Sequence, residues 1–302
     1  MAPTLSLRVD IDTFHGCRDG IAPIARELDA LGVRATFFVV TGRDTSGRHM
    51  KRITTPGYLR RLRAVNVFDV LKRLRLRSLL YGTVLPGPRV AAGNAALLRA
   101  LRASGHELGL HGNDHARWAD DVDSLTEDEA LDAWRRAGDD FAEMIGARAT
   151  SAAAPNWRVS DAALHAFDRL PMDYRSDVRG RGAFYPTVEG RACATLQLPV
   201  DLPACHELLA SCGCSLEETP AKLLATLDPA APNVWNLHDW FEGLRAPWLV
   251  RPVVEGARAM GYEVVTMAEA AGAAKARGAV PSAAVARRAV PGGVGTVSCR
   301  VP

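Results

Sequence analysis

Short apolar segments alternate with helical segments through most of this 302-residue chain. The predicted strands are Leu5–Ile11, Ala35–Val40, Glu107–Leu110, Ala149–Ala154, Leu196–Val200, Val234–His238 and Glu263–Thr266. The predicted helices are Ile21–Leu31, Asn94–Ala103, Asp123–Ile145, Pro220–Leu227 and Pro252–Met260. Strands that alternate with helices form mostly parallel sheets that are covered on both faces. Because polar side chains follow several of these strands, the pattern predicts an α/β fold with its functional residues at the strand C-termini, as in a (β/α) barrel.

Two of the apolar segments end in pairs of polar side chains. Asp10 and Asp12 are two residues apart at the end of the first strand, so they project from one face. His111 and His115 are four residues apart, so one helical turn would point both imidazoles the same way. One carboxylate and two imidazoles form a three-ligand site with an open position, as in catalytic zinc and non-haem iron proteins. We predict that Asp12, His111 and His115 bind a divalent metal ion, with Asp10 beside it as a base. The alternative is a strand-end cap and two solvated histidines.

The composition divides the chain into a catalytic domain, an insertion and a tail. Residues 1–272 are predicted to form the domain, and residues 273–302, rich in Ala, Gly, Pro, Val and Arg, a flexible tail. Residues 43–89 interrupt the alternation and are too long for an ordinary loop, so we expect a helical insertion. Its segment 43–77 carries eleven Lys or Arg and two Asp, a local charge of +9 in a chain of net charge +3.

This basic insertion suits an anionic membrane surface, with partial burial of Phe68, Leu71 and Leu74 in the lipid. A solvated helix face is the alternative. Nucleic acid is disfavoured as a partner, because no recognised nucleic-acid-binding module surrounds the block. The N-terminal residues do not resemble a signal peptide and no segment has the length of a membrane span, so we expect a cytoplasmic protein. Its six cysteines are predicted to be free thiols, and no protein partner is implied.

These motifs resemble the polysaccharide deacetylase (NodB-homology) superfamily. Asp10-Ile-Asp12, His111-x-x-x-His115 and Leu237-His238 occur in the order found in that family of metal-dependent amide and ester hydrolases. The resemblance implies a distorted (β/α) barrel, with Asp10 as the base, Asp12 and both histidines as metal ligands, and His238 as the general acid. Zn, Mn, Co or Ni would suit this ligand set.

One branch of the family is more similar still, namely the deformylases that act on 4-deoxy-4-formamido-L-arabinose carried on undecaprenyl phosphate in lipid A modification. The matching segments include Arg8–Phe14, Gly47–His49, Leu80–Thr83, Trp157–Arg158 and Arg179–Gly180. The chain departs from that branch near the expected pocket. The departures are Gly112-Asn113, the extra residue at Pro155-Asn156, and Asp239-Trp240-Phe241. The resemblance implies a lipid-linked aminosugar substrate and a peripheral position on the inner face of the cytoplasmic membrane.

Four residues would share the catalytic chemistry. Asp10 would take a proton from water and His238 would give one to the leaving amine. Arg158 is predicted to orient Asp10 through a paired contact, although a surface arginine is the alternative. Asp177 is predicted to steer His238.

The remaining site residues are predicted to contact the substrate. A backbone N–H near Asn156–Trp157 would complete an oxyanion site. Arg48 and His49 would contact a phosphate, although solvated loop residues are an equal alternative. The full predicted set is Arg48, His49, Tyr81, Asn156, Trp157, Tyr174, Arg179 and Glu242.

Three other functions remain open. One is an N-deacetylase for a different cell-wall or soluble aminosugar. A second is an iron oxygenase with the same two-histidine, one-carboxylate ligand set, although such enzymes usually carry His-x-Asp and a distant His. A third is a catalytically silent binding protein, which would have no need of Asp10 or His238.

Overall fold

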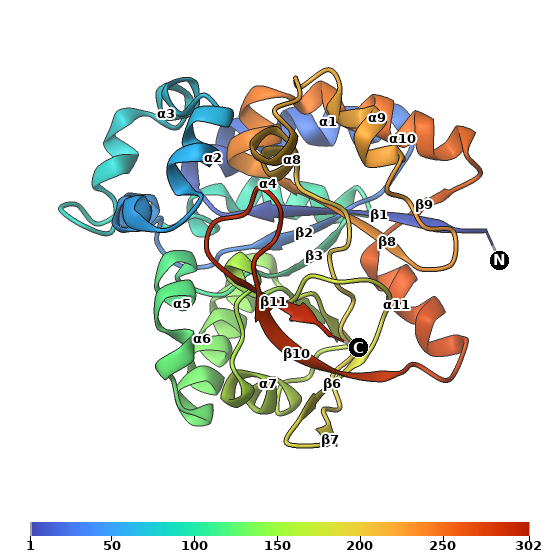
Figure 1. The fold of residues 1–302 in the computed structure, drawn as a ribbon. Coiled ribbons are helices and arrows are strands. Elements are labelled where there is room, and N and C mark those ends of the chain that lie inside the picture. The colour runs from blue at the N-terminus through green and yellow to red at the C-terminus, as the bar shows by residue number, and fades with distance from the viewer. Residues whose placement is uncertain (1, 302) are drawn as a thin grey trace.

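Seven parallel strands form the central sheet of the protein (Figure 1). The computed structural model describes residues 2–301, apart from the side chains at 67, 68, 70 and 71. The strand order is β5-β4-β3-β2-β1-β8, and β9 pairs with the start of β1. The strands are β1 (Thr4–Ile11), β2 (Thr36–Val39), β3 (Glu107–Leu110), β4 (Ser151–Ala152), β5 (Tyr174–Arg175), β8 (Asn233–His238) and β9 (Glu263–Val265). Since all pairs are parallel, the strand C-termini meet at one edge.

The sheet curls because residues 196–202 connect its two outer strands. The Arg175 N–H donates to the Leu196 carbonyl at 2.8 Å, and the Leu202 N–H donates to the Val234 carbonyl at 3.3 Å. This segment makes isolated bridges and no regular strand, so the strand predicted at Leu196–Val200 is only partly formed. The result is the distorted, incompletely closed barrel that the resemblance implied.

Helices cover the sheet and supply its core contacts. Leu5, Leu7, Val9 and Ile11 of β1 are fully buried, as expected for a central parallel strand. The helices are α1 (Ile21–Leu31), α4 (Ala95–Ala103), α5 (His115–Asp121), α6 (Glu127–Ile145), α7 (Asp161–Asp168), α8 (Cys205–Cys212), α9 (Thr219–Leu224), α10 (Val250–Ala259) and α11 (Met267–Ala276). Shorter helical turns are η1 (Gly16–Gly20), η4 (Ala92–Asn94), η5 (Val122–Ser124), η6 (Pro155–Trp157), η7 (Asp239–Gly243) and η8 (Pro247–Leu249). None of the described helices is long and apolar enough to cross a membrane.

The insertion is helical, as predicted, and lies at the carboxyl end of the central strands (Figure 1). It contains η2 (Ser46–Thr54), α2 (Tyr58–Ala64), α3 (Val67–Leu74) and η3 (Leu76–Leu80). Its two ends are tied together because the Asp44 N–H donates to the Pro88 carbonyl at 2.8 Å. The insertion is therefore a fixed neighbour of the strand ends.

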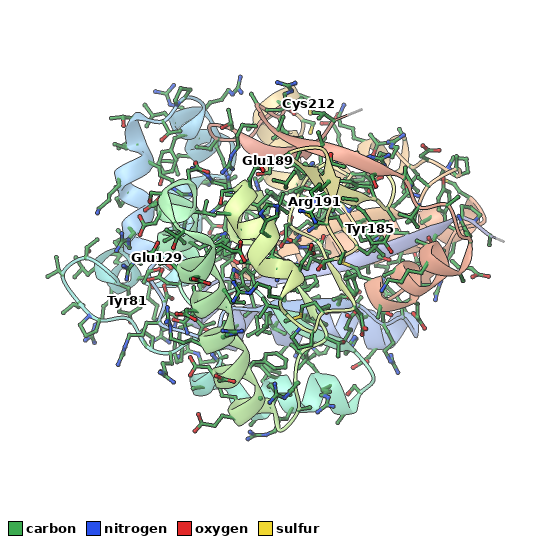
Figure 2. All side chains as sticks on the ribbon, turned by 90° about the horizontal axis from the view of Figure 1, so that it is seen from below. Tyr81, Glu129, Tyr185, Glu189, Arg191 and Cys212 are labelled. Atoms are coloured by element: carbon green, nitrogen blue, oxygen red, sulfur yellow. The ribbon has the colours of Figure 1, made fainter. Side chains whose placement is uncertain are left out.

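A second sheet of four strands overturns the prediction of a flexible tail at 273–302. The order is β11-β10-β6-β7, with β6 (Tyr185–Val188), β7 (Arg191–Ala192), β10 (Ser282–Arg288) and β11 (Val297–Arg300). Figure 2 labels Tyr185 of β6, Arg191 of β7, and Glu189 in the turn between these strands. The C-terminal segment is ordered because β10 pairs with both β6 and β11, so that hydrogen bonds satisfy its backbone groups on both edges.

Candidate active site

Three potential metal ligands meet at the carboxyl end of the central sheet. Asp12 follows β1, His111 follows β3, and His115 is the first residue of α5. The prediction that both histidines share a helical turn is wrong, since Gly112 between them adopts a left-handed backbone with φ of 76°. The turn at Gly112, which favours glycine, still brings both imidazoles to Asp12.

The geometry of these three side chains fits a divalent ion. One ligand atom from each lies within 4.8 Å of the other two. The Nε2 atoms of His111 and His115 lie 3.3 and 3.4 Å from Asp12 Oδ1. His111 Nδ1 donates to the Ala153 carbonyl at 2.8 Å, which leaves its Nε2 lone pair free to face the cluster. Asp12 Oδ1 is buried and accepts no hydrogen bond from the described part of the chain, so a cation would give it a partner.

The electrostatics keep Asp12 and His115 in the protonation states that bind a metal. Burial raises the pKa of Asp12, but the neighbouring His115 and His111 more than offset burial and hold it well below its usual range. Burial is also the main cause that lowers the pKa of His115 to about 4, despite the opposing charge of Asp12. An anionic carboxylate and a neutral imidazole are the forms that coordinate metals.

Asp10 is held by Arg8, and the predicted contact with Arg158 is wrong. Arg8 donates from Nε and Nη2 to the two carboxylate oxygens of Asp10, both at 2.8 Å. The two residues lie on the same face of β1, two positions apart. Burial raises the pKa of Asp10, but Arg8 and His111 outweigh it, and the net shift is downward. Arg158 lines the pocket but pairs instead with Asp123.

His238 ends β8 and lies in register with Asp10 on the adjacent β1. Its Nδ1 is 3.8 Å from Glu242 Oε2, which also accepts the His238 backbone N–H at 2.7 Å. Burial lowers the pKa of His238, but Glu242 outweighs it and the net shift is upward. Asn236 Nδ2 lies 3.2 Å from both Asp10 Oδ2 and His238 Nε2, and so links the two groups.

The prediction that Asp177 orients His238 is wrong. Its carboxylate is fully buried, where it accepts bonds from Arg175 and Gln197, both at 2.7 Å, and from the Ala154 backbone N–H. Asp177 therefore stabilises the strand ends, and Glu242 takes the position beside His238.

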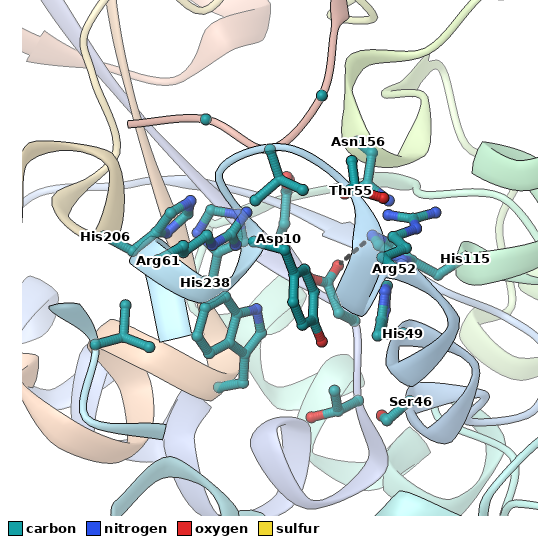
Figure 3. Close-up of a pocket in the computed structure, with 18 of the residues that line it drawn as sticks. Asp10, Ser46, His49, Arg52, Thr55, Arg61, His115, Asn156, His206 and His238 are labelled. Atoms are coloured by element: carbon teal, nitrogen blue, oxygen red, sulfur yellow. Dashed lines mark ion pairs between the residues drawn. The ribbon is translucent and has the colours of Figure 1, made fainter. Parts of the chain in front are cut away.

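Asp10, His238 and the three candidate metal ligands line a pocket of about 480 Å³, a volume usual for small-molecule sites. Figure 3 shows His206, Arg61 and His238 on one side of the pocket, and Arg52, His49 and His115 on the other. Three of the predicted substrate-binding residues contribute to its lining: His49, Asn156 and Trp157. The Asn156 Nδ2 group is buried and has no partner in the described residues. The Trp157 N–H donates to the Ala154 carbonyl at 3.3 Å, so the oxyanion role stays a prediction.

The other five predicted substrate-binding residues lie outside the pocket lining. Tyr81, labelled on the insertion in Figure 2, is buried with its ring 6.5 Å from that of His15. Tyr174 donates its hydroxyl to Glu107 at 2.8 Å, and Arg179 pairs with Glu207. Arg48 has a buried Nε atom with no partner among the described residues, and Glu242 lies behind His238.

Several residues in or next to the site are not predicted by the sequence analysis. Arg8 had a readable signal, since it precedes Asp10 by two positions on the same strand face. His206, Arg61 and Trp240 come from α8, α2 and η7, and no sequence pattern joins them. Residues 293–297, from the connection after β10 to the first residue of β11, also form part of the pocket wall.

The comparisons with known proteins identify the family. Residues 4–175 match the family model described as polysaccharide deacetylase, and the chain belongs to that family. A relative from Shewanella sediminis is named a probable 4-deoxy-4-formamido-L-arabinose-phosphoundecaprenol deformylase, ArnD. It is 29% identical over 270 residues, which cover 88% of this chain and 85% of the relative. The prediction of a hydrolase of the deacetylase and deformylase kind is confirmed.

Solved structures confirm the fold. A "putative polysaccharide deacetylase" from Mycobacterium smegmatis superposes with a TM-score of 0.63 at 16% identity, over 96% of this chain and 95% of that one. A family 4 acetyl xylan esterase from Clostridium thermocellum, solved with a cobalt ion, gives a TM-score of 0.52 at 16% identity, over 88% and 89% of the two chains. At these identities the likeness shows the fold alone.

Proposed function

We propose that this protein hydrolyses the N-formyl amide of 4-deoxy-4-formamido-L-arabinose carried on undecaprenyl phosphate, with one divalent ion of Zn, Mn, Co or Ni. The observation that carries the proposal is the pairing of Asp10 with His238 in register on β1 and β8, beside the cluster of Asp12, His111 and His115. The name of the Shewanella relative supports the choice of sugar and carrier.

The chain's own residues supply both proton transfers. Asp10, kept anionic by Arg8, takes a proton from the water that attacks the formyl carbon. When the C–N bond breaks, His238 gives a proton to the departing nitrogen, so that formate and a free amine result. Glu242 favours the cationic form of His238 that this step requires. Asp12, His111 and His115 would hold a divalent ion, which would supply the Lewis acidity that polarises a carbonyl and makes water a better nucleophile.

The pocket lining supports an amphipathic substrate. Polar groups from the strand ends occupy one part of the lining, and apolar side chains from the insertion occupy another, namely Met50, Leu62, Val65, Leu74 and Leu79. Such a division suits a sugar joined to a hydrocarbon chain. A soluble aminosugar would leave the apolar part of the lining without a partner.

The surface of the insertion supports peripheral binding to the anionic inner face of the cytoplasmic membrane. Six of the eight exposed large hydrophobic side chains in the described residues belong to it, namely Met50, Ile53, Leu59, Leu76, Leu80 and Val84. Exposed arginines lie among them. The expected insertion of Leu74 into lipid is wrong, because this side chain is buried, and the side chains of Phe68 and Leu71 lie outside the described residues.

The test is incubation with formylated and acetylated versions of one carrier-linked aminosugar, with formate, acetate and free amine measured. We expect formate and free amine from the formylated substrate. Acetate release at an equal or higher rate would favour the N-deacetylase alternative. Oxidised product in place of formate would favour the oxygenase, which membership of the deacetylase family already argues against.

A further inference from the structure

We infer that His206 and Arg61 form a phosphate-binding subsite beside His238, which holds the phosphodiester that joins the sugar to its carrier. The inference deepens the proposed function and rests on it for the identity of the sugar. Neither residue takes part in the chemistry assigned to Asp10 and His238.

His206 is a buried polar side chain without a partner in the structure. It is 1% exposed, and neither Nδ1 nor Nε2 has a hydrogen-bond partner in the part of the chain that is described. The ring lines the pocket, with its centroid 4.9 Å from that of His238 and 5.6 Å from that of Trp240. A buried polar group left unpaired costs free energy. A ligand with hydrogen-bonding oxygens would remove that cost.

Arg61 brings a positive charge to the same place. It lies on α2 of the insertion, which packs against α8, the helix that carries His206. Its guanidinium carbon lies 5.6 Å from the centroid of the Trp240 ring, so the indole contacts both side chains. Figure 3 shows Arg61 and His206 on the His238 side of the pocket.

The charge of Arg61 is not neutralised by a carboxylate of the described residues. Two other arginines of the pocket are paired, Arg52 with Asp120 at 2.9 Å and Arg158 with Asp123. Glu207, which also lines the pocket, is occupied by Arg179 Nη1 at 2.9 and 2.8 Å. Arg61 is therefore available to an anion that enters the pocket.

The chemistry of these groups selects a phosphate. A guanidinium offers a planar set of donors that matches two phosphate oxygens, and an imidazole adds one N–H. Because the His206 ring lies against His238, an anion held here would be close to the leaving amine. A sugar whose amide reaches the metal ligands would place its phosphate on this side. The apolar lining from Leu62 and Val65 continues from α2, where the carrier chain would follow.

The experiment compares two soluble substrates, the formamido sugar as a short-chain alkyl phosphodiester and as its methyl glycoside. Wild type should have a lower KM for the phosphodiester. Arg61→Gln and His206→Gln should each raise that KM about ten- to hundredfold, as expected for a lost hydrogen bond to a charged group. The KM for the methyl glycoside should stay unchanged. Arg60→Gln is the matched control, since Arg60 is the exposed neighbour on α2.

Each outcome decides a separate point. No formate from either substrate would refute the proposed function, and calorimetric binding of the phosphodiester to wild type and Arg61→Gln would then still test the subsite. Equal KM values for both substrates in wild type, or an unchanged preference in both variants, would overturn the subsite. If inorganic phosphate competes in wild type while the phosphodiester has no advantage, the site binds free phosphate and the inference is wrong.

Discussion

Replacing Arg8 by Met should destabilise the protein by about 3–5 kcal/mol at pH 7, the cost of leaving one member of a buried ion pair without its partner. Solvent offers little compensation, because the Arg8 and Asp10 side chains are 1% and 4% exposed. Arg8 also donates from Nη1 to the Ser176 carbonyl at 2.5 Å, which a methionine would leave unpaired. The double variant Arg8→Met/Asp10→Asn removes both charges, so it should lose less than the sum of the single variants.

The loss should depend on pH in a defined direction. Burial raises the pKa of Asp10, and Arg8 is the largest of the causes that lower it. In wild type the lowered pKa gives stability that is present above the unfolded pKa of about 4, and that is lost as the pH falls through the folded value. In Arg8→Met burial would dominate and the pKa would rise. The deficit should therefore be largest at neutral pH and shrink on acidification as the carboxyl is protonated.

Urea unfolding with a chelator present measures this directly, because bound metal then adds nothing to stability. Wild type, both single variants and the double variant are compared at pH 7 and near pH 4. An unfolding free energy of Arg8→Met equal to wild type at pH 7 would refute the reasoning. So would a deficit that grows on acidification, or strict additivity in the double variant.

Four further outcomes are expected. Chelation should abolish turnover, Zn, Mn, Co or Ni should restore it, and His111→Ala should bind less metal by elemental analysis; full activity of metal-free protein would contradict the assignment. Asp10→Asn and His238→Ala should each keep the metal and lose about 10²–10⁴ in kcat, and near-normal kcat with saturating substrate would remove the role assigned. Glu242→Gln should lower the pKa of His238 and move the alkaline limb of the kcat profile to lower pH, whereas an unmoved limb would show that Glu242 does not act on His238. Wild type should sediment with anionic vesicles at low salt and less at high salt. A variant with four exposed cations of the insertion changed to Gln should sediment less. Binding that does not depend on lipid charge would show that the insertion only packs against the strand ends and does not bind the membrane. The four are Arg63, Lys72, Arg75 and Arg77.

The strands, the helices and the cluster of candidate metal ligands could be predicted because their signals are local. The predicted helix Ile21–Leu31 and strand Glu107–Leu110 coincide with α1 and β3. Each candidate metal ligand follows an apolar strand or begins a helix next to one. In a parallel sheet, strand C-termini meet at one edge, so the order of the motifs was enough to place them together.

The partners of these groups could not be predicted with the same success. Arg158 and Asp177 were chosen because they lie in motifs that resemble the family. In the structure Arg158 pairs with Asp123, and Asp177 pairs with Arg175. Which buried cation meets which carboxylate depends on side-chain packing between elements, and the sequence does not encode that as spacing. The C-terminal strands were missed because small residues and arginines give a weak strand signal, which pairing with β6 overrides.

The place of β8 in the sheet has a consequence for how the protein is made. Strand β8 is the neighbour of β1 on one side, yet its residues leave the ribosome more than two hundred positions later. At about 5–20 residues per second, β1 waits roughly 10–50 s with that edge unpaired. The wall at residues 293–297 comes later still. An unpaired strand edge can pair with the wrong strand or with another chain. We therefore expect chaperones to bind β1 of the nascent chain. Translation that pauses between β3 and β8 should increase aggregation.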